Sequence, residues 1–135
     1  VYGLEERAAS QISFNDIRSF SKEGILIENA SGINFHDMVL DIQQGNPLEA
    51  RDSQGILWDL VTVKSAVWDK PYFIFKNCQD IRISNCYQPE KIGSFILIDD
   101  KCNNIYLVNN ILPGTSLPGK KDSSQFSILN NITGK

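Results

Sequence analysis

Acidic side chains are the first residues to consider for chemistry, because a carboxylic acid and a carboxylate about 6.5 to 9.5 Å apart can hydrolyse a glycosidic bond with inversion. Asp99 and Asp100 are adjacent and follow an apolar strand phrase. Successive side chains of a strand point to opposite sides, so these two carboxylates are not expected to share one substrate. They therefore predict no catalytic pair.

Charged residues also recur at one position of an internal repeat, directly after an apolar strand. Stacked strands lie about 4.8 Å apart, so Glu28 and Asp99, three repeats apart, are expected about 14 Å apart, too far for an acid and base pair. The alternating signs predict a ladder of surface ion pairs. The alternative is that the basic members hold an anionic sugar chain. The position is occupied by Arg7, Glu28, Arg51, Lys76 and Asp99.

His36 is the single histidine, and it is expected beside Asn15 and Asp59 on neighbouring strands, as an exposed His–Asp pair. No serine or cysteine is expected next to it, so no nucleophile and base arrangement is predicted. The Asn and Asp residues at the corners are expected to hydrogen-bond their own turns, with a calcium site as the alternative. These corner residues are Asn29, Asp52, Asn77 and Asp100.

The three cysteines, Cys78, Cys86 and Cys102, have no zinc-like spacing. Because their number is odd, they define neither a disulfide framework nor a cellular compartment. We expect three buried free thiols. The sequence predicts no metal site and no cofactor.

Exposed aromatic rings matter for a sugar ligand, because sugars bind by stacking on them. The rings expected in the core are Phe35, Trp58, Phe73 and Phe75. The rings expected in loops or at outward positions are Trp68, Tyr72, Tyr87 and Tyr106, and Trp68 is the first candidate for a sugar contact. The substrate-binding residues predicted from sequence are therefore Trp68, Arg7, Arg51, Lys76 and Tyr106.

These residues are positioned by a sequence repeat of roughly 21 to 25 residues. Each repeat has an apolar strand, an Asn or Asp turn, a second apolar strand and another Asn or Asp. Alternation with a period of two indicates half-buried strands. Because the copies run in one direction, equivalent strands should stack in parallel around a dry interior. The sequence predicts an all-β, right-handed parallel β-helix of about six coils. Two inward columns are expected: Ile12, Ile33, Ile56, Ile81, Ile105 and Phe126, beside Phe14, Phe35, Trp58, Ile83, Leu107 and Ile128.

A leucine-rich repeat is the alternative architecture, because its unit length overlaps with this one. Its unit has one strand and a helical or 3₁₀ return, whereas each unit here has two strand phrases and a third apolar stretch such as residues 61–63. The β-helix therefore fits better. Residues 65–70 and 113–124 are predicted loops, and 113–124, rich in Pro, Gly, Ser and Lys, should protrude from the stack.

Composition limits the domain count and the partners. A chain of 135 residues suits a single domain, expected to span 1–135. With 13 Lys and Arg against 16 Asp and Glu, it has no basic field for nucleic acid, and no apolar run approaches the roughly 18 residues of a membrane span. Neither partner is expected. Because patterned sequence begins at Val1 without a Met, we expect a piece of a longer protein, truncated at its N-terminal end.

The first coils carry a more specific pattern: Gly-Leu-Glu-Glu-Arg at residues 3–7, Gln-Ile-Ser-Phe-Asn-Asp-Ile at 11–17, and Gly24 followed by Glu-Asn-Ala at 28–30. This pattern resembles the final coils of polygalacturonase-like glycoside hydrolases of family 28. The likeness is strongest from Val1 to Trp58 and generic afterwards. The resemblance implies the pectin lyase-like β-helix, an extracellular or periplasmic location, and inverting hydrolysis of galacturonan or related pectic chains.

The catalytic motifs of that family do not occur in this chain. They comprise Asn-Thr-Asp, Asp-Asp after a Gly, Gly-His-Gly and Arg-Ile-Lys, all upstream of the matched region. Asp99 and Asp100 follow Ile98 rather than Gly, and His36 stands between Phe35 and Asp37. No catalytic residue is carried over, so the chain alone is expected to be inactive.

The leading hypothesis is therefore the C-terminal β-helix portion of a secreted polygalacturonase-type hydrolase, with the chemistry in upstream coils. The alternatives are a non-catalytic glycan-binding β-helix and a purely structural module. The partner expected through the parent protein is a pectic or other polysaccharide. A β-helix cut between coils exposes strand edges at residues 1–17, so self-association through this end is also expected.

Overall fold

A computed structural model describes residues 1–65, 71–88, 94–113, 117 and 124–133, which form strands and turns without a helix. Within these ranges there is accordingly no helix that could span a membrane. The strands are β1 (Ala9–Ser21), β2 (Ile25–Glu28), β3 (Ala30–Ile42), β4 (Leu48–Arg51), β5 (Gln54–Ser65), β6 (Pro71–Lys76), β7 (Gln79–Ser84), β8 (Ser94–Ile98), β9 (Asn103–Val108), β10 (Ile111–Leu112), β11 (Phe126–Leu129) and β12 (Ile132–Thr133).

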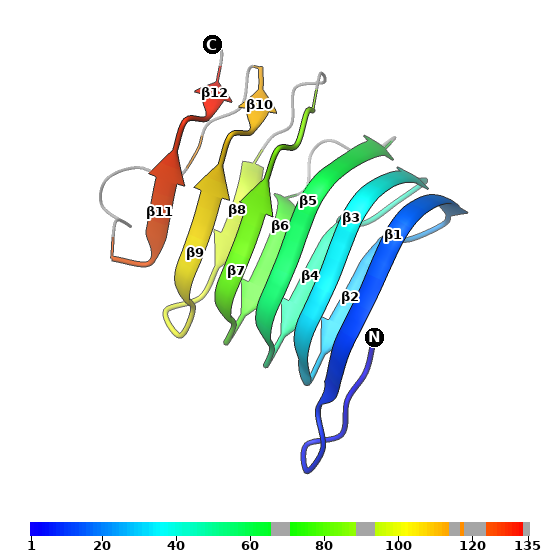
Figure 1. The fold of residues 1–135 in the computed structure, drawn as a ribbon, viewed down its shortest axis with the longest axis vertical. Coiled ribbons are helices and arrows are strands. Elements are labelled where there is room, and N and C mark those ends of the chain that lie inside the picture. Colours follow the sequence, from blue (N-terminus) through cyan, green and yellow to red (C-terminus); the bar gives the residue numbers. More distant parts are fainter. Residues whose placement is uncertain (66–70, 89–93, 114–116, 118–123, 134–135) are drawn as a thin grey trace.

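The strands form three parallel sheets. One sheet has six strands in the order β1-β3-β5-β7-β9-β11, one has four in the order β2-β4-β6-β8, and β10 pairs with β12. Figure 1 shows the four-stranded sheet behind the six-stranded sheet, with strands of the two sheets alternating along the chain from β1 to β9. The predicted all-β parallel β-helix is confirmed, and the stack has about five coils rather than six. The described part of the last coil has β11 and β12 but no strand in the four-stranded sheet.

The register of the six-stranded sheet confirms the order of both predicted columns, although Ile128 in the last coil is 42% exposed rather than in the core. Ile33 lies opposite Ile56, and Phe35 lies opposite Trp58, with the other members following in the same order. The rings of Phe14 and Phe35 stack with centroids 5.2 Å apart, and Trp58 meets Phe73 of the opposite sheet edge-on at 5.4 Å. Full burial of each such side chain contributes about 1.5 to 3 kcal/mol, so these columns supply most of the cohesion of the stack.

Left-handed residues turn the corners of each coil. One corner ladder has φ between 52° and 56° at Asp16, Asp37, Leu60, Asn85, Asn109 and Asn130. Asn and Asp tolerate this conformation because their short polar side chains bond locally, whereas Leu60 has no such compensation. A second ladder contains Gln11, Gly32, Gly55, Asp80 and Asn104, and a third contains Asn29, Asp52 and Asn77. The corner positions expected for Asn29, Asp52 and Asn77 are confirmed, whereas Asp100 lies in a turn and is not among the left-handed residues. Asn77 Nδ2 donates to Asp52 of the neighbouring coil at 2.7 Å rather than to its own turn.

Some sequence expectations lie outside the described ranges or are wrong. Trp68 and most of the predicted loops at 65–70 and 113–124 fall outside them. Tyr72 is 4% exposed rather than outward, because its ring packs against Phe73 and Phe95, with centroids 4.7 and 5.8 Å away.

The Leu60 corner gives a stability prediction. A left-handed conformation costs an ordinary L-residue about 1 to 2 kcal/mol, and Leu60 is 47% exposed, so little burial is lost on replacing it. Leu60→Asn should raise the free energy of unfolding by about 1 kcal/mol in a urea titration. The reverse change at an equivalent corner, Asn109→Leu, should lower it by a similar amount. A Leu60→Asn protein less stable than the wild type would contradict this explanation.

The first coil gives a second prediction. β1 is a 13-residue edge strand, and beside it an apolar pocket of about 350 Å³ is lined by Phe14, Ile17, Met38 and neighbouring residues. Long open edges recruit further strands, so the chain 1–135 should associate through this end in sedimentation velocity. Ser19→Lys, which places a charge in the pocket, should weaken the association, whereas Ser127→Lys on β11 should not. A wild-type chain that stays monomeric at high concentration would refute the prediction.

Candidate functional site

The outer face of the six-stranded sheet brings chemically capable side chains together. We define this outer face by Asn34, His36, Asp59, Arg82 and Tyr106. They alternate along their strands with core residues, so they point away from the interior. The register places His36 opposite Asp59 and Arg82 opposite Tyr106. Residues more than 20 positions apart in sequence thus become immediate neighbours.

Asp59 is held by three hydrogen bonds. His36 Nδ1 lies 2.9 Å from one carboxylate oxygen, while Ser84 Oγ and Asn85 Nδ2 donate to the other at 2.8 and 2.7 Å. Burial alone would raise the pKa of Asp59, but the hydrogen bonds from Ser84, Asn85 and His36 outweigh it and lower the pKa below its ordinary value of 3.8. Asp59 is therefore a fixed carboxylate at neutral pH.

This carboxylate orients the imidazole ring of His36. The His36 side chain is 47% exposed, while that of Asp59 is only 15% exposed. An imidazole held through Nδ1 presents Nε2 in a defined direction, where it can bond a ligand hydroxyl. The expected exposed His–Asp pair is confirmed. Ser84 bonds Asp59 rather than His36, so the order Ser–Asp–His lacks the nucleophile-to-base contact of a catalytic triad.

The lowered pKa of Asp59 predicts a pH effect on stability. A carboxylate with a lowered folded-state pKa stabilises the fold above its ordinary pKa, and that contribution is lost as the pH falls through the folded-state value. The melting temperature of the wild type should exceed that of Asp59→Asn near neutral pH, and this difference should shrink between about pH 4 and pH 2. Ser84→Ala removes one donor to Asp59, so its melting temperature should fall less than that of the wild type over the same pH range. A difference in melting temperature between the wild type and Asp59→Asn that stays constant down to pH 2 would contradict the role of Asp59 as a stabilising carboxylate.

Arg82 and Tyr106 form a second pair on the outer face. They are in register on β7 and β9, Tyr106 is 39% exposed, and Arg82 is exposed. Arg82 makes no ion pair with any residue that the structure describes. Its guanidinium is therefore available for a carboxylate, next to a ring on which a sugar can stack. Sequence reasoning missed Arg82, although its outward place between Ile81 and Ile83 could have revealed it.

The other predicted binding residues lie on a different sheet. Glu28, Arg51 and Lys76 are in register on the outward side of the four-stranded sheet, as expected. The ion pairs form instead with Glu49, whose Oε1 lies 2.7 Å from Arg51 Nη2 and 3.8 Å from Lys76 Nζ. The bond to Glu49 raises the pKa of Arg51. Two cations thus share one carboxylate.

Arg7 does not occupy its expected place in this column. Tyr2, rather than Arg7, lies opposite Glu28, because residues 4–7 form a tight turn in which Arg7 bridges back to Leu4. Tyr106 lies on the six-stranded sheet, and Trp68 lies outside the described ranges. The structure therefore does not gather the predicted binding residues into one site.

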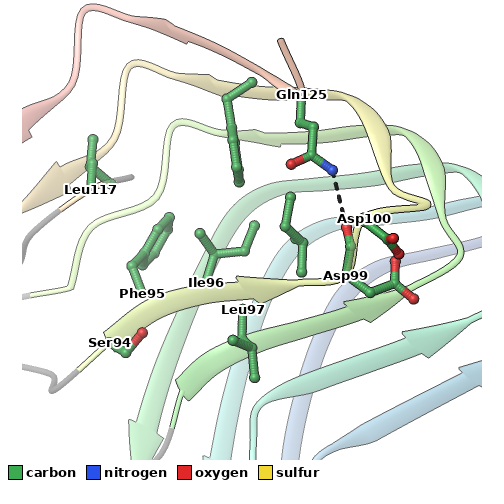
Figure 2. Close-up of a pocket in the computed structure, with 10 residues that line it drawn as sticks. Ser94, Phe95, Ile96, Leu97, Asp99, Asp100, Leu117 and Gln125 are labelled. Carbon is green, nitrogen blue, oxygen red and sulfur yellow. Dashed lines mark hydrogen bonds between the residues drawn. The ribbon is translucent and has the colours of Figure 1, made fainter. Parts of the chain in front are cut away.

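A pocket of about 430 Å³ lies at the edge of β8, where the four-stranded sheet ends. Figure 2 shows Gln125 reaching across from the last coil to the backbone carbonyl of Asp99, a 3.0 Å hydrogen bond. Asp99 and Asp100 both line this pocket. β8 ends at Ile98, and strand alternation no longer applies beyond it.

The β8 pocket suits an anionic sugar less well than the outer face does. Burial alone would raise the pKa of Asp99, but hydrogen bonds from the Asn77 N–H, the Cys102 thiol and the backbone N–H groups of Lys101 and Cys102 lower it overall, which keeps Asp99 ionised. Two carboxylates at one end would repel a polyanion. Among the described residues, no group of three or more His, Cys, Asp or Glu side chains could hold a metal ion.

This protein is classified by its fold and by the geometry of its outer face. No protein-family model matches the chain. No curated protein matches its sequence either. The class that the structure defines is the parallel β-solenoid, with a polar, partly cationic outer face on its six-stranded sheet.

Proposed function

We propose that this chain is the non-catalytic β-helix portion of an exported, polygalacturonase-type glycoside hydrolase, and that the outer face of its six-stranded sheet binds pectic chains. The observation that carries the proposal is the in-register pair of Arg82 and Tyr106. A guanidinium beside an exposed ring matches a sugar that carries a carboxylate, because the cation binds the acid while the ring stacks on the sugar.

The rest of the outer face extends this contact. His36 lies two strands from Arg82, about 10 Å across the sheet, which is longer than a single sugar ring. His36 and Asn34 offer hydrogen-bonding groups for sugar hydroxyls, and His36 is oriented by Asp59. An extended chain crossing the strands would therefore meet an aromatic ring, a cation and an oriented imidazole in succession.

Hydrolysis is assigned to another part of the enzyme. Inverting hydrolysis needs two carboxyl groups with different protonation states, separated by room for a water. Asp59 is fixed as a carboxylate by three donors, and Asp99 is held ionised, so neither is suited to be the acid. The family motifs that supply this chemistry are missing from the sequence.

Binding is tested by calorimetric titration with polygalacturonate oligosaccharides. Arg82→Ala should weaken binding by about tenfold or more, since a hydrogen bond to a charged group contributes about 1.5 to 3 kcal/mol and about 1.4 kcal/mol corresponds to tenfold. Tyr106→Ala should also weaken binding, because the ring on which the sugar stacks is lost. Arg18→Ala is the matched control, because Arg18 lies on the same sheet but is already paired with Asp16 and Asp37. Methyl-esterified oligosaccharides, which lack the charge, should bind more weakly than the acids.

Further variants separate the alternatives. Trp68→Ala, Arg51→Ala and Lys76→Ala test the other binding residues predicted from sequence, and loss of binding only in these variants would contradict binding at the outer face. No binding to any pectic oligosaccharide would favour a purely structural module. Release of reducing sugars from polygalacturonate by the chain alone would contradict the assignment of catalysis to other coils.

A further inference from the structure

Two of the three cysteines occupy equivalent positions in adjacent coils. Cys78 follows the left-handed corner at Asn77, Cys102 follows the turn at Asp100 and Lys101 in the next coil, and both point into the core. Cys78 is 1% exposed and Cys102 is 2% exposed. The same column holds Ser53 one coil earlier, whose hydroxyl accepts a hydrogen bond from the Ala30 N–H at 3.1 Å. A small side chain at this place thus links consecutive coils.

The register places Cys78 and Cys102 opposite each other on adjacent coils. Gln79 pairs with Asn103, and the Asn103 N–H donates to the Cys78 carbonyl at 3.1 Å, so Cys78 and Cys102 are opposite neighbours on adjacent coils. Adjacent strands are about 4.8 Å apart, within the roughly 4.4 to 6.8 Å between Cα atoms that a disulfide requires. Cys102 Sγ lies 3.4 Å from the Cys78 backbone nitrogen.

Cys86 offers an internal contrast. It is also buried and free, but its neighbour in the next coil is the fully buried amide of Asn110, which accepts a hydrogen bond from the Cys86 N–H at 3.0 Å. The register therefore provides a thiol partner for Cys78 and Cys102 and none for Cys86 among the described residues.

We propose that Cys78 and Cys102 form an inter-coil disulfide when the chain folds in the presence of a small-molecule disulfide, leaving Cys86 as a free thiol. Cys78 thiolate attacks one sulfur of glutathione disulfide and releases one glutathione thiolate. Cys102 thiolate then attacks Cys78 Sγ and displaces the second glutathione. Two protein thiols are oxidised and one glutathione disulfide is reduced, and the two protons lost by the protein thiols are taken up by the two glutathione thiolates to give two glutathione thiols.

The bond should form during folding rather than afterwards. Burial raises the pKa of the Cys78 thiol to about 11 and raises that of Cys102, so few thiolates exist in the folded chain at neutral pH. Exchange needs the thiolate and access to it. Oxidation of the folded protein should therefore be slow at pH 7 and faster at higher pH. Once formed, the bond closes a loop of more than 20 residues and should raise the melting temperature by several degrees.

Trypsin allows a direct test, because it places each cysteine in its own peptide: residues 77–82, 83–91 and 102–120. The full chain is refolded from urea with reduced and oxidised glutathione, digested without reduction and analysed by mass spectrometry. The expected product is a disulfide-linked pair of peptides 77–82 and 102–120, whose mass is two hydrogens below the sum of the two reduced peptides. Cys86 in peptide 83–91 should instead react, as a free thiol, with an alkylating reagent. Three labelled cysteines, glutathione adducts alone, or a pair that includes Cys86 would overturn the proposal.

Serine variants keep the test independent of misfolding. Ser53 occupies the same column, so Cys78→Ser and Cys102→Ser should fold, as checked by circular dichroism. Each should lose the cross-linked peptide and the rise in melting temperature on oxidation. Cys86→Ser should keep both. A cross-link that survives Cys78→Ser, or one that disappears in Cys86→Ser, would contradict the pairing.

Discussion

Parallel hydrogen bonding between equivalent strands of successive coils is the interaction on which the other features of this protein depend. It sets a fixed register, in which Ile33, Ile56 and Ile81 follow one another in the core. The same register places His36 against Asp59 and Arg82 against Tyr106 on the outer face. Because strand side chains alternate, a slip of one residue would exchange the core face for the outer face. The apolar columns therefore hold the polar site in place.

The corners bend the chain of each coil. Left-handed residues occur at up to three positions per coil, and side-chain amides connect these corners from one coil to the next. Asn77 Nδ2 donates to Asp52 at 2.7 Å, and Asn104 Nδ2 donates to Asp80 at 3.0 Å. Inside the stack, Asn110 donates to the Ile83 carbonyl at 3.0 Å, which satisfies a backbone group that the turn would otherwise leave unpaired. These contacts between corners help to keep the side chains of the outer face regularly spaced.

The sequence predicted the parts of the structure that repeat. Ile12 and Phe14 start two columns whose members could be assigned in advance, because alternation and corner residues recur in every coil. The pairing of His36 with Asp59 was predicted, but the donation from Asn85 to Asp59 was not, since Asn85 lies 26 residues away and the contact depends on side-chain direction at a corner. Tyr72 was misplaced because two consecutive residues, Tyr72 and Phe73, are both buried at the start of β6, where alternation fails.

A double-mutant cycle between His36 and Asp59 tests the register most directly, because these residues are 23 positions apart in sequence and meet only if adjacent coils stack as described. The free energy of unfolding is measured for the wild type, His36→Ala, Asp59→Ala and the double variant at neutral pH. The account predicts a coupling of about 0.5 kcal/mol or more between the two changes. Strictly additive effects would contradict the stacking that brings the outer face together.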